Sequence, residues 1–106
     1  MTEANEKRSQ IRKPARIPVK VRQPGGTEHE GVTRDLSSTG IFLYSDGALE
    51  LGTKLELVVM LPAELGIGNG GWTLCQASVV RVEAVDSQRV GVAATLDRVE
   101  LLPELI

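Results

Sequence analysis

The sequence predicts an all-β fold, a six-stranded antiparallel β-barrel, and three observations support this. Apolar and polar residues alternate in short segments, which is the period of a half-buried strand. Turn-forming residues, mostly Gly, Pro, Asp and Ser, separate these segments. No long segment has the period of a helix. A barrel is preferred to a sandwich because closing so small a sheet removes its exposed edges.

The order of these segments gives the expected strands. In the first strand Ile17, Val19 and Val21 alternate with Pro18, Lys20 and Arg22. After the last strand, a cap by Asp97 and a stop by Pro103 predict a short C-terminal helix. The glycine-rich stretch 62–71 is expected to form a loop. The six expected strands are 17–22, 28–36, 41–44, 54–61, 72–85 and 89–96, with turns at 23–26, 37–40, 46–47, 51–52 and 86–87.

Composition limits the class of protein. A chain of 106 residues with 42% hydrophobic residues closes one modest core, so a second domain is not expected. The single cysteine, Cys75, excludes an internal disulfide and a multi-cysteine metal site, and it indicates a reducing compartment. No apolar run is long enough for a membrane span or a secretory signal. We therefore expect a cytoplasmic protein without a cofactor.

The charge is unevenly distributed along the chain. Residues 1–22 carry seven basic and two acidic side chains, whereas the remainder carries five basic and twelve acidic ones, within a net charge of −2. Positive potential is thus concentrated in an N-terminal arm. Such an arm favours an anionic ligand, either a nucleic-acid backbone or a compact phosphorylated molecule.

Two motifs carry the functional prediction. Arg12 and Arg16 form an RxxxR pattern just before the first strand, and Asp35, Ser37 and Gly40 form a DxSxxG pattern at the second turn. Each has an ordinary structural interpretation, as a solvated basic tail and as a set of turn-forming residues. In this order and strand setting, however, the two patterns together resemble the paired signature of PilZ domains.

The resemblance implies a bacterial receptor for the second messenger cyclic di-GMP. Residues 1–10 are polar and without periodicity, which indicates a flexible N-terminus, and the resemblance makes residues 11–106 a PilZ-like domain with a PilZ-type barrel. The resemblance also implies a protein partner in motility, biofilm or polysaccharide control. In the family the residue before RxxxR influences ligand stoichiometry; here it is Ile11, which favours a single ligand.

The chemistry of the five motif residues suits this ligand. The arginine forks of Arg12 and Arg16 match a phosphate or the O6/N7 edge of guanine, and their planes stack on bases. Ionised Asp35 accepts hydrogen bonds only, which suits the N1 and N2 donors of guanine. Ser37 offers a hydroxyl, and Gly40 is expected to provide positive φ or close backbone approach.

Three other functions are weighed against the receptor. The fold could serve as a protein-interaction adaptor without nucleotide binding, although such adaptors typically lack the arginine pair. A nucleic-acid-binding barrel is disfavoured by the scarcity of aromatic residues, 3%. Catalysis is not expected, because His29 and Ser37 lie in separate stretches and no nucleophile elbow is present. We expect His29 to be exposed, Trp72 to pack in the core or a loop, and Cys75 to be a buried small hydrophobe.

Overall fold

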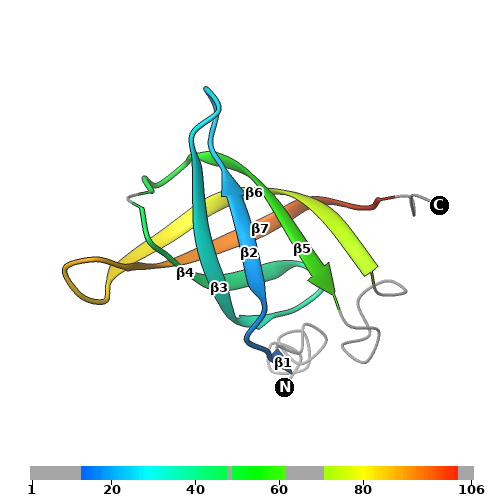
Figure 1. The fold of residues 1–106 in the computed structure, drawn as a ribbon, viewed down its shortest axis with the longest axis horizontal. Coiled ribbons are helices and arrows are strands. Elements are labelled where there is room, and N and C mark those ends of the chain that lie inside the picture. Colours follow the sequence, from blue (N-terminus) through cyan, green and yellow to red (C-terminus); the bar gives the residue numbers. More distant parts are fainter. Residues whose placement is uncertain (1–12, 48, 62–70, 103–106) are drawn as a thin grey trace, which may run out of the picture.

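The computed structural model describes residues 13–47, 49–61 and 71–102, and in these ranges the chain is all-β (Figure 1). A closed six-stranded antiparallel barrel is formed by β2 to β7, and β1 is an additional short strand. The predicted fold class is therefore confirmed. The strands are β1 (Lys13–Pro14), β2 (Pro18–Arg22), β3 (Glu28–Leu36), β4 (Gly40–Ser45), β5 (Lys54–Leu61), β6 (Gly71–Ala84) and β7 (Val90–Leu101).

The strands are hydrogen-bonded in the order β1-β3-β2-β5-β6-β7-β4, and pairing of β3 with β4 closes the ring. All pairs are antiparallel. In Figure 1, β2 and β3 cross in front of the long β6–β7 hairpin, and β1 lies beside the end of β3. Closure leaves the six barrel strands with neighbours on both sides over part of their lengths, which limits edge-to-edge aggregation.

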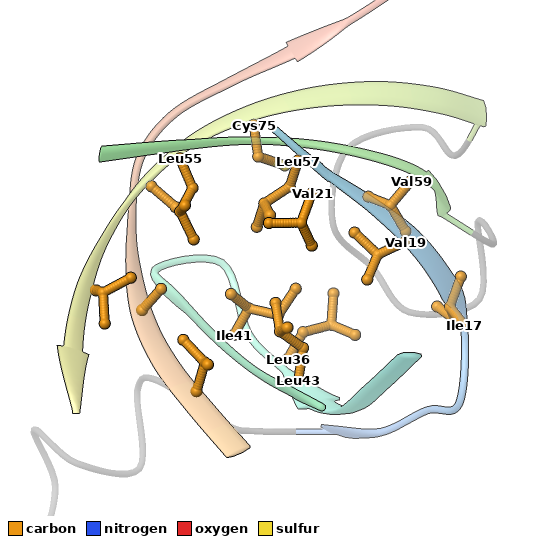
Figure 2. Packing of buried hydrophobic residues seen from close by; sticks show 14 of the residues in the cluster. Ile17, Val19, Val21, Leu36, Ile41, Leu43, Leu55, Leu57, Val59 and Cys75 are labelled. Atoms are coloured by element: carbon orange, nitrogen blue, oxygen red, sulfur yellow. The ribbon is translucent and has the colours of Figure 1, made fainter. Parts of the chain in front are cut away.

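The core follows from the alternation seen in the sequence. In β2, β5 and β6 every second side chain is buried along most of the strand. Figure 2 shows Val19, Val21 and Leu57 pointing inward toward Leu36 and Ile41 on the other side of the barrel. Each such side chain stabilises the fold by about 2 kcal/mol through removal of apolar surface from water.

Several predicted boundaries agree with the structure, and one element does not. The strands 28–36 and 54–61 have the expected bounds, and the turn at 23–26 contains Gly25 and Gly26 with positive φ. The predicted C-terminal helix is wrong, because β7 continues as a strand to Leu101. Asp97 caps no helix; its carboxylate accepts hydrogen bonds from the hydroxyls of Ser78 and Thr95. Of the predicted loop 62–71, only Gly71 lies within the described residues, as the first residue of β6.

Candidate functional site: the lead-in beside the β3–β4 turn

The segment before the first barrel strand runs along the end of β3. In residues 13–17, which we call the lead-in, Lys13 pairs with Leu36 and Pro14 pairs with Asp35. Pro14, which lies between the two arginines of the first motif, is therefore directly beside Asp35, the first residue of the second motif. The structure brings the described part of the first pattern, residues 13–16, beside the second pattern, which lies about twenty residues further along the chain.

A buried threonine fixes the lead-in on both sides of Arg16. The Thr33 hydroxyl donates a hydrogen bond to the Ala15 carbonyl and accepts one from the Ile17 N–H at 2.9 Å. Arg16 stands between these two attachment points, and its side chain is exposed. The side chain of Ile17 is buried in the core, and Ala15 packs against it. Arg16 is consequently anchored at its backbone while its guanidinium projects outward.

A β-bulge in β3 places two charged residues on the outer surface. Against β4, Thr33 pairs with Leu43 and Asp35 pairs with Phe42, so Arg34 is an extra residue in the ladder. Because of this, Thr33 and Leu36 are both buried although three positions apart, while Arg34 and Asp35 are adjacent and both face away from the core. Bulges of this kind re-aim side chains and are common beside functional sites.

Arg34 interacts with Asp35, Phe42 and Tyr44 on the outer surface. Its Nε donates to Oδ2 of Asp35 at 2.7 Å, and its guanidinium carbon lies 3.8 Å from the centroid of the Phe42 ring. The hydrogen bond to Asp35 is the main cause that raises the pKa of Arg34 above its usual value. The Arg34 side chain is 47% exposed and that of Asp35 is 14% exposed. Asp35 is thus held against the sheet by a cation that itself lies over an aromatic ring.

The second motif also forms its own turn. The Ser37 hydroxyl accepts hydrogen bonds from the N–H groups of Thr39 (3.3 Å) and Gly40 (3.1 Å), and Ser37 N–H donates to the Gly40 carbonyl at 2.8 Å. The structural role of Ser37 as a turn-forming residue is therefore present. Of the two roles expected for Gly40, positive φ or close backbone approach, the first is not found, since the described glycines with positive φ are Gly25, Gly26, Gly52 and Gly71. Gly40 instead begins β4 and approaches Ser37 closely through its backbone.

Comparison with protein families matches the PilZ domain over residues 6–102, nearly the whole chain. The chain belongs to the PilZ domain family. The resemblance of the two motifs is thereby confirmed at the level of the family. No curated protein sequence matches the chain significantly.

Solved structures share the PilZ fold at low sequence identity. An inhibitor of motility from Bacillus subtilis (MotI/DgrA) aligns with a TM-score of 0.69 at 18% identity, over 86% of this chain and 43% of that protein. The PilZ domain with c-di-GMP of YcgR from Escherichia coli aligns with a TM-score of 0.63 at 12% identity, over 83% of this chain and 76% of that domain. The PilZ domain of CeSA from a cellulose-synthesising bacterium gives a TM-score of 0.54 at 25% identity, with 83% coverage of each chain.

Four of the five motif residues of this PilZ domain are described. Arg16, Asp35, Ser37 and Gly40 lie around the junction of the lead-in, β3 and the β3–β4 turn. Arg12 lies outside the described residues, as do Ile11 and the segment 1–10.

Three residues of this junction, Thr33, Arg34 and Phe42, were missed by sequence reasoning. Arg34 directly precedes the DxSxxG pattern, which is the one local signal that could have indicated it. Thr33 bonds residues 16 and 18 positions away, so no local pattern indicates its role. Phe42 pairs with Asp35 in the β3–β4 hairpin, but its place under Arg34 depends on the bulge.

Other residues considered from the sequence lie away from this junction. His29 was expected to be exposed, but its side chain is only 19% exposed. Its ring forms a hydrogen bond with the Gln23 amide, and its Nδ1 lies 3.8 Å from Oδ1 of Asp46. It lies near the opposite end of β3 from Ser37, about 26 Å along the strand, too far for the two to act together. Trp72, expected in the core or a loop, is on the outside of β6 and 54% exposed. Cys75 is buried as expected, and burial raises its pKa to about 11.

Metal sites, membrane-spanning helices and hollows were sought in the described ranges. These ranges contain no group of three or more His, Cys, Asp or Glu side chains placed to hold a metal ion. Within the same residues, no helix is long and apolar enough to span a membrane. A hollow of about 590 Å³ lies at the far end of β2 from Arg16, beside Arg22, Lys54 and Asp97, and is therefore separate from the junction.

Proposed function

We propose that this PilZ domain is a receptor for cyclic di-GMP, bound where the lead-in meets the β3–β4 turn. The pairing of Pro14 with Asp35 carries the proposal, because it joins the segment that bears the arginines to the carboxylate of the second motif. Had these regions lain on opposite sides of the barrel, one small ligand could not contact both. The structure of the YcgR PilZ domain with c-di-GMP, which has the same fold, supports the choice of ligand.

The chemistry of each side chain suggests which part of the ligand it would bind. Arg16 projects outward from a backbone that Thr33 holds, so its planar fork is available for a phosphate or a guanine edge. Arg12 would add a second fork from four residues earlier. Asp35, on the adjacent strand, would accept the N1 and N2 donors of guanine, which distinguishes guanine from adenine.

Binding would produce a signal through the N-terminal arm. A ligand held by Arg12 and Arg16 sets the position of the residues that precede β1 relative to the barrel. A partner protein could then recognise the ligand together with the arm. The similarity to MotI/DgrA, an inhibitor of motility, makes a motility partner one candidate, beside biofilm and polysaccharide control. We place the receptor in the cytoplasm, where an unpaired cysteine such as Cys75 stays reduced.

A second candidate function is an adaptor that keeps the PilZ fold without binding the nucleotide. One observation favours it: Ser37 is a buried residue, 4% exposed, and its hydroxyl is already hydrogen-bonded within its own turn. A ligand would have to replace these contacts or use the backbone around them. The adaptor therefore remains a distinct outcome of the binding experiment.

Isothermal titration tests the proposal. The wild-type protein is titrated with cyclic di-GMP, GMP, cyclic di-AMP and a single-stranded oligonucleotide, and binding at low-micromolar affinity or tighter is expected for cyclic di-GMP alone. Arg16→Ala should weaken binding by about 1–3 kcal/mol without loss of thermal stability. Arg98→Ala is the matched control, since Arg98 is an exposed arginine on the part of β7 that extends beyond its pairing with β4.

Two results would refute the receptor. Absence of binding by the folded wild type would leave the adaptor. Equal affinity for the oligonucleotide would indicate a nucleic-acid-binding module instead.

A further inference from the structure

We propose that Arg34 is an additional ligand-binding residue, which stacks its guanidinium plane on one guanine base of cyclic di-GMP. The inference rests on the proposed function and adds a residue that belongs to neither motif of the family. It is carried by the position of Arg34 in the bulge, by its support on Phe42, and by the exposure of its side chain.

The bulge gives Arg34 its place. In a regular antiparallel ladder, Phe42 would pair with Arg34, the residue that follows Thr33. Instead Phe42 pairs with Asp35, and Arg34 is left as the extra residue. The extra residue faces outward next to Asp35 rather than into the core. On the other side, the Arg34 carbonyl accepts the N–H of Ala15 at 3.1 Å, one residue before Arg16. Arg34 therefore stands between the two motifs.

Phe42 and Asp35 hold the guanidinium in one orientation. The guanidinium carbon lies 3.8 Å from the ring centroid, and the 2.7 Å hydrogen bond from Nε to Oδ2 of Asp35 restrains the guanidinium from a second side. The Phe42 ring is itself buried and contacts Tyr44 edge to face at 5.6 Å between centroids. Little side-chain entropy would thus be lost when a base binds to the arginine.

The opposite surface of the guanidinium is available to a base. Phe42 lies against the guanidinium and Asp35 bonds its Nε edge, yet the Arg34 side chain as a whole stays 47% exposed, which leaves surface for a ligand. Guanine bases stack on arginine planes, and lysine, which has no plane, cannot replace arginine in this contact. A base in this position would lie over Arg34 with its hydrogen-bonding edge within reach of the neighbouring strand residue, Asp35.

Substitution by lysine separates stacking from charge. Affinity for cyclic di-GMP is measured by isothermal titration for wild type, Arg34→Ala, Arg34→Lys and the control Arg98→Ala, with thermal melting to verify folding. Stacking predicts that Arg34→Ala and Arg34→Lys both weaken binding by about ten- to a hundredfold, while Arg98→Ala binds like wild type. If Arg34→Lys binds like wild type, Arg34 supplies only charge and the proposal is wrong; unchanged binding by Arg34→Ala has the same consequence.

A second measurement reports on the site directly. The Nε–H resonance of Arg34, assigned by its disappearance in Arg34→Lys, should shift when cyclic di-GMP is added, because a stacked base adds a ring current. An unchanged resonance at saturating ligand would overturn the inference while leaving the receptor function intact. Failure of the wild type to bind would instead overturn both proposals, so the two failures are distinguishable.

Discussion

Replacement of Thr33 by valine tests how the lead-in is held to the barrel. Valine has nearly the same shape but lacks the hydroxyl, which bonds the Ala15 carbonyl and the Ile17 N–H. The Ile17 bond is buried, so its N–H would lose its partner at a cost of about 1–3 kcal/mol. The Ala15 contact is only partly buried, and water can replace it at a cost of about 1 kcal/mol. We therefore expect Thr33→Val to lower the free energy of unfolding by about 2–4 kcal/mol.

Urea denaturation followed by circular dichroism measures this loss. Thr95→Val is the matched control, because the Thr95 hydroxyl bonds Asp97 at the exposed surface of β7, and its removal should change stability by less than about 0.5 kcal/mol. If Thr33→Val is as stable as the control variant, the hydroxyl does not secure the lead-in, and the backbone anchoring of Arg16 is not explained by it.

Three further predictions concern other parts of the fold. Gly91→Ala should destabilise the protein by about 1–3 kcal/mol, since the new Cβ would lie 2.8 Å from Cζ of the buried Phe42; an unchanged melting temperature would contradict this packing. Cys75, whose pKa burial raises to about 11, should react slowly with a thiol reagent at pH 8 and rapidly in denaturant; fast labelling of the native protein would show that the thiol is accessible. Two backbone N–H groups lower the pKa of Asp86, so its stabilising contribution is present above about pH 4 and is lost as the pH falls; Asp86→Ala should therefore flatten the acid side of the stability curve, and identical curves would argue against that role.

The barrel could be predicted from sequence because its strands alternate so regularly. In β5 the inward residues Leu55, Leu57 and Val59 are visible as a period of two, and the structure buries all three. The same logic could have placed Trp72 on the outside. It is out of phase with the buried Cys75, Ala77 and Val79 of its own strand, so the parity of β6 contradicts a core position.

The errors arose where distant pairing overrides a local signal. Asp97 and Pro103 look like the start and stop of a helix, but pairing with β6 extends β7 to Leu101. A bulge beside Ala77 absorbs the change of register there. The two-residue strand β1 has no periodicity of its own and forms only because β3 extends beyond β2.

The candidate site was predictable in its motif residues but not in its geometry. The sequence pointed to Arg16 and Asp35, and the structure places their segments on neighbouring strands. Thr33 was missed because its role depends on hydrogen bonds to residues 16 and 18 positions away. Arg34 was missed because, apart from its place directly before the second motif, its role depends on the bulge. The ligand itself stays a prediction from the family.

The bulge at Arg34 also constrains how sequences of this fold can be aligned. Insertion or deletion of one residue elsewhere in β3 would rotate either Thr33 or Leu36 out of the core. A gap in the following turn would break the mutual hydrogen bonds of Ser37 and Gly40. Differences in strand length among relatives are therefore expected at position 34, where the spacing between the lead-in and the turn can change by one residue without exchanging the two faces of the sheet.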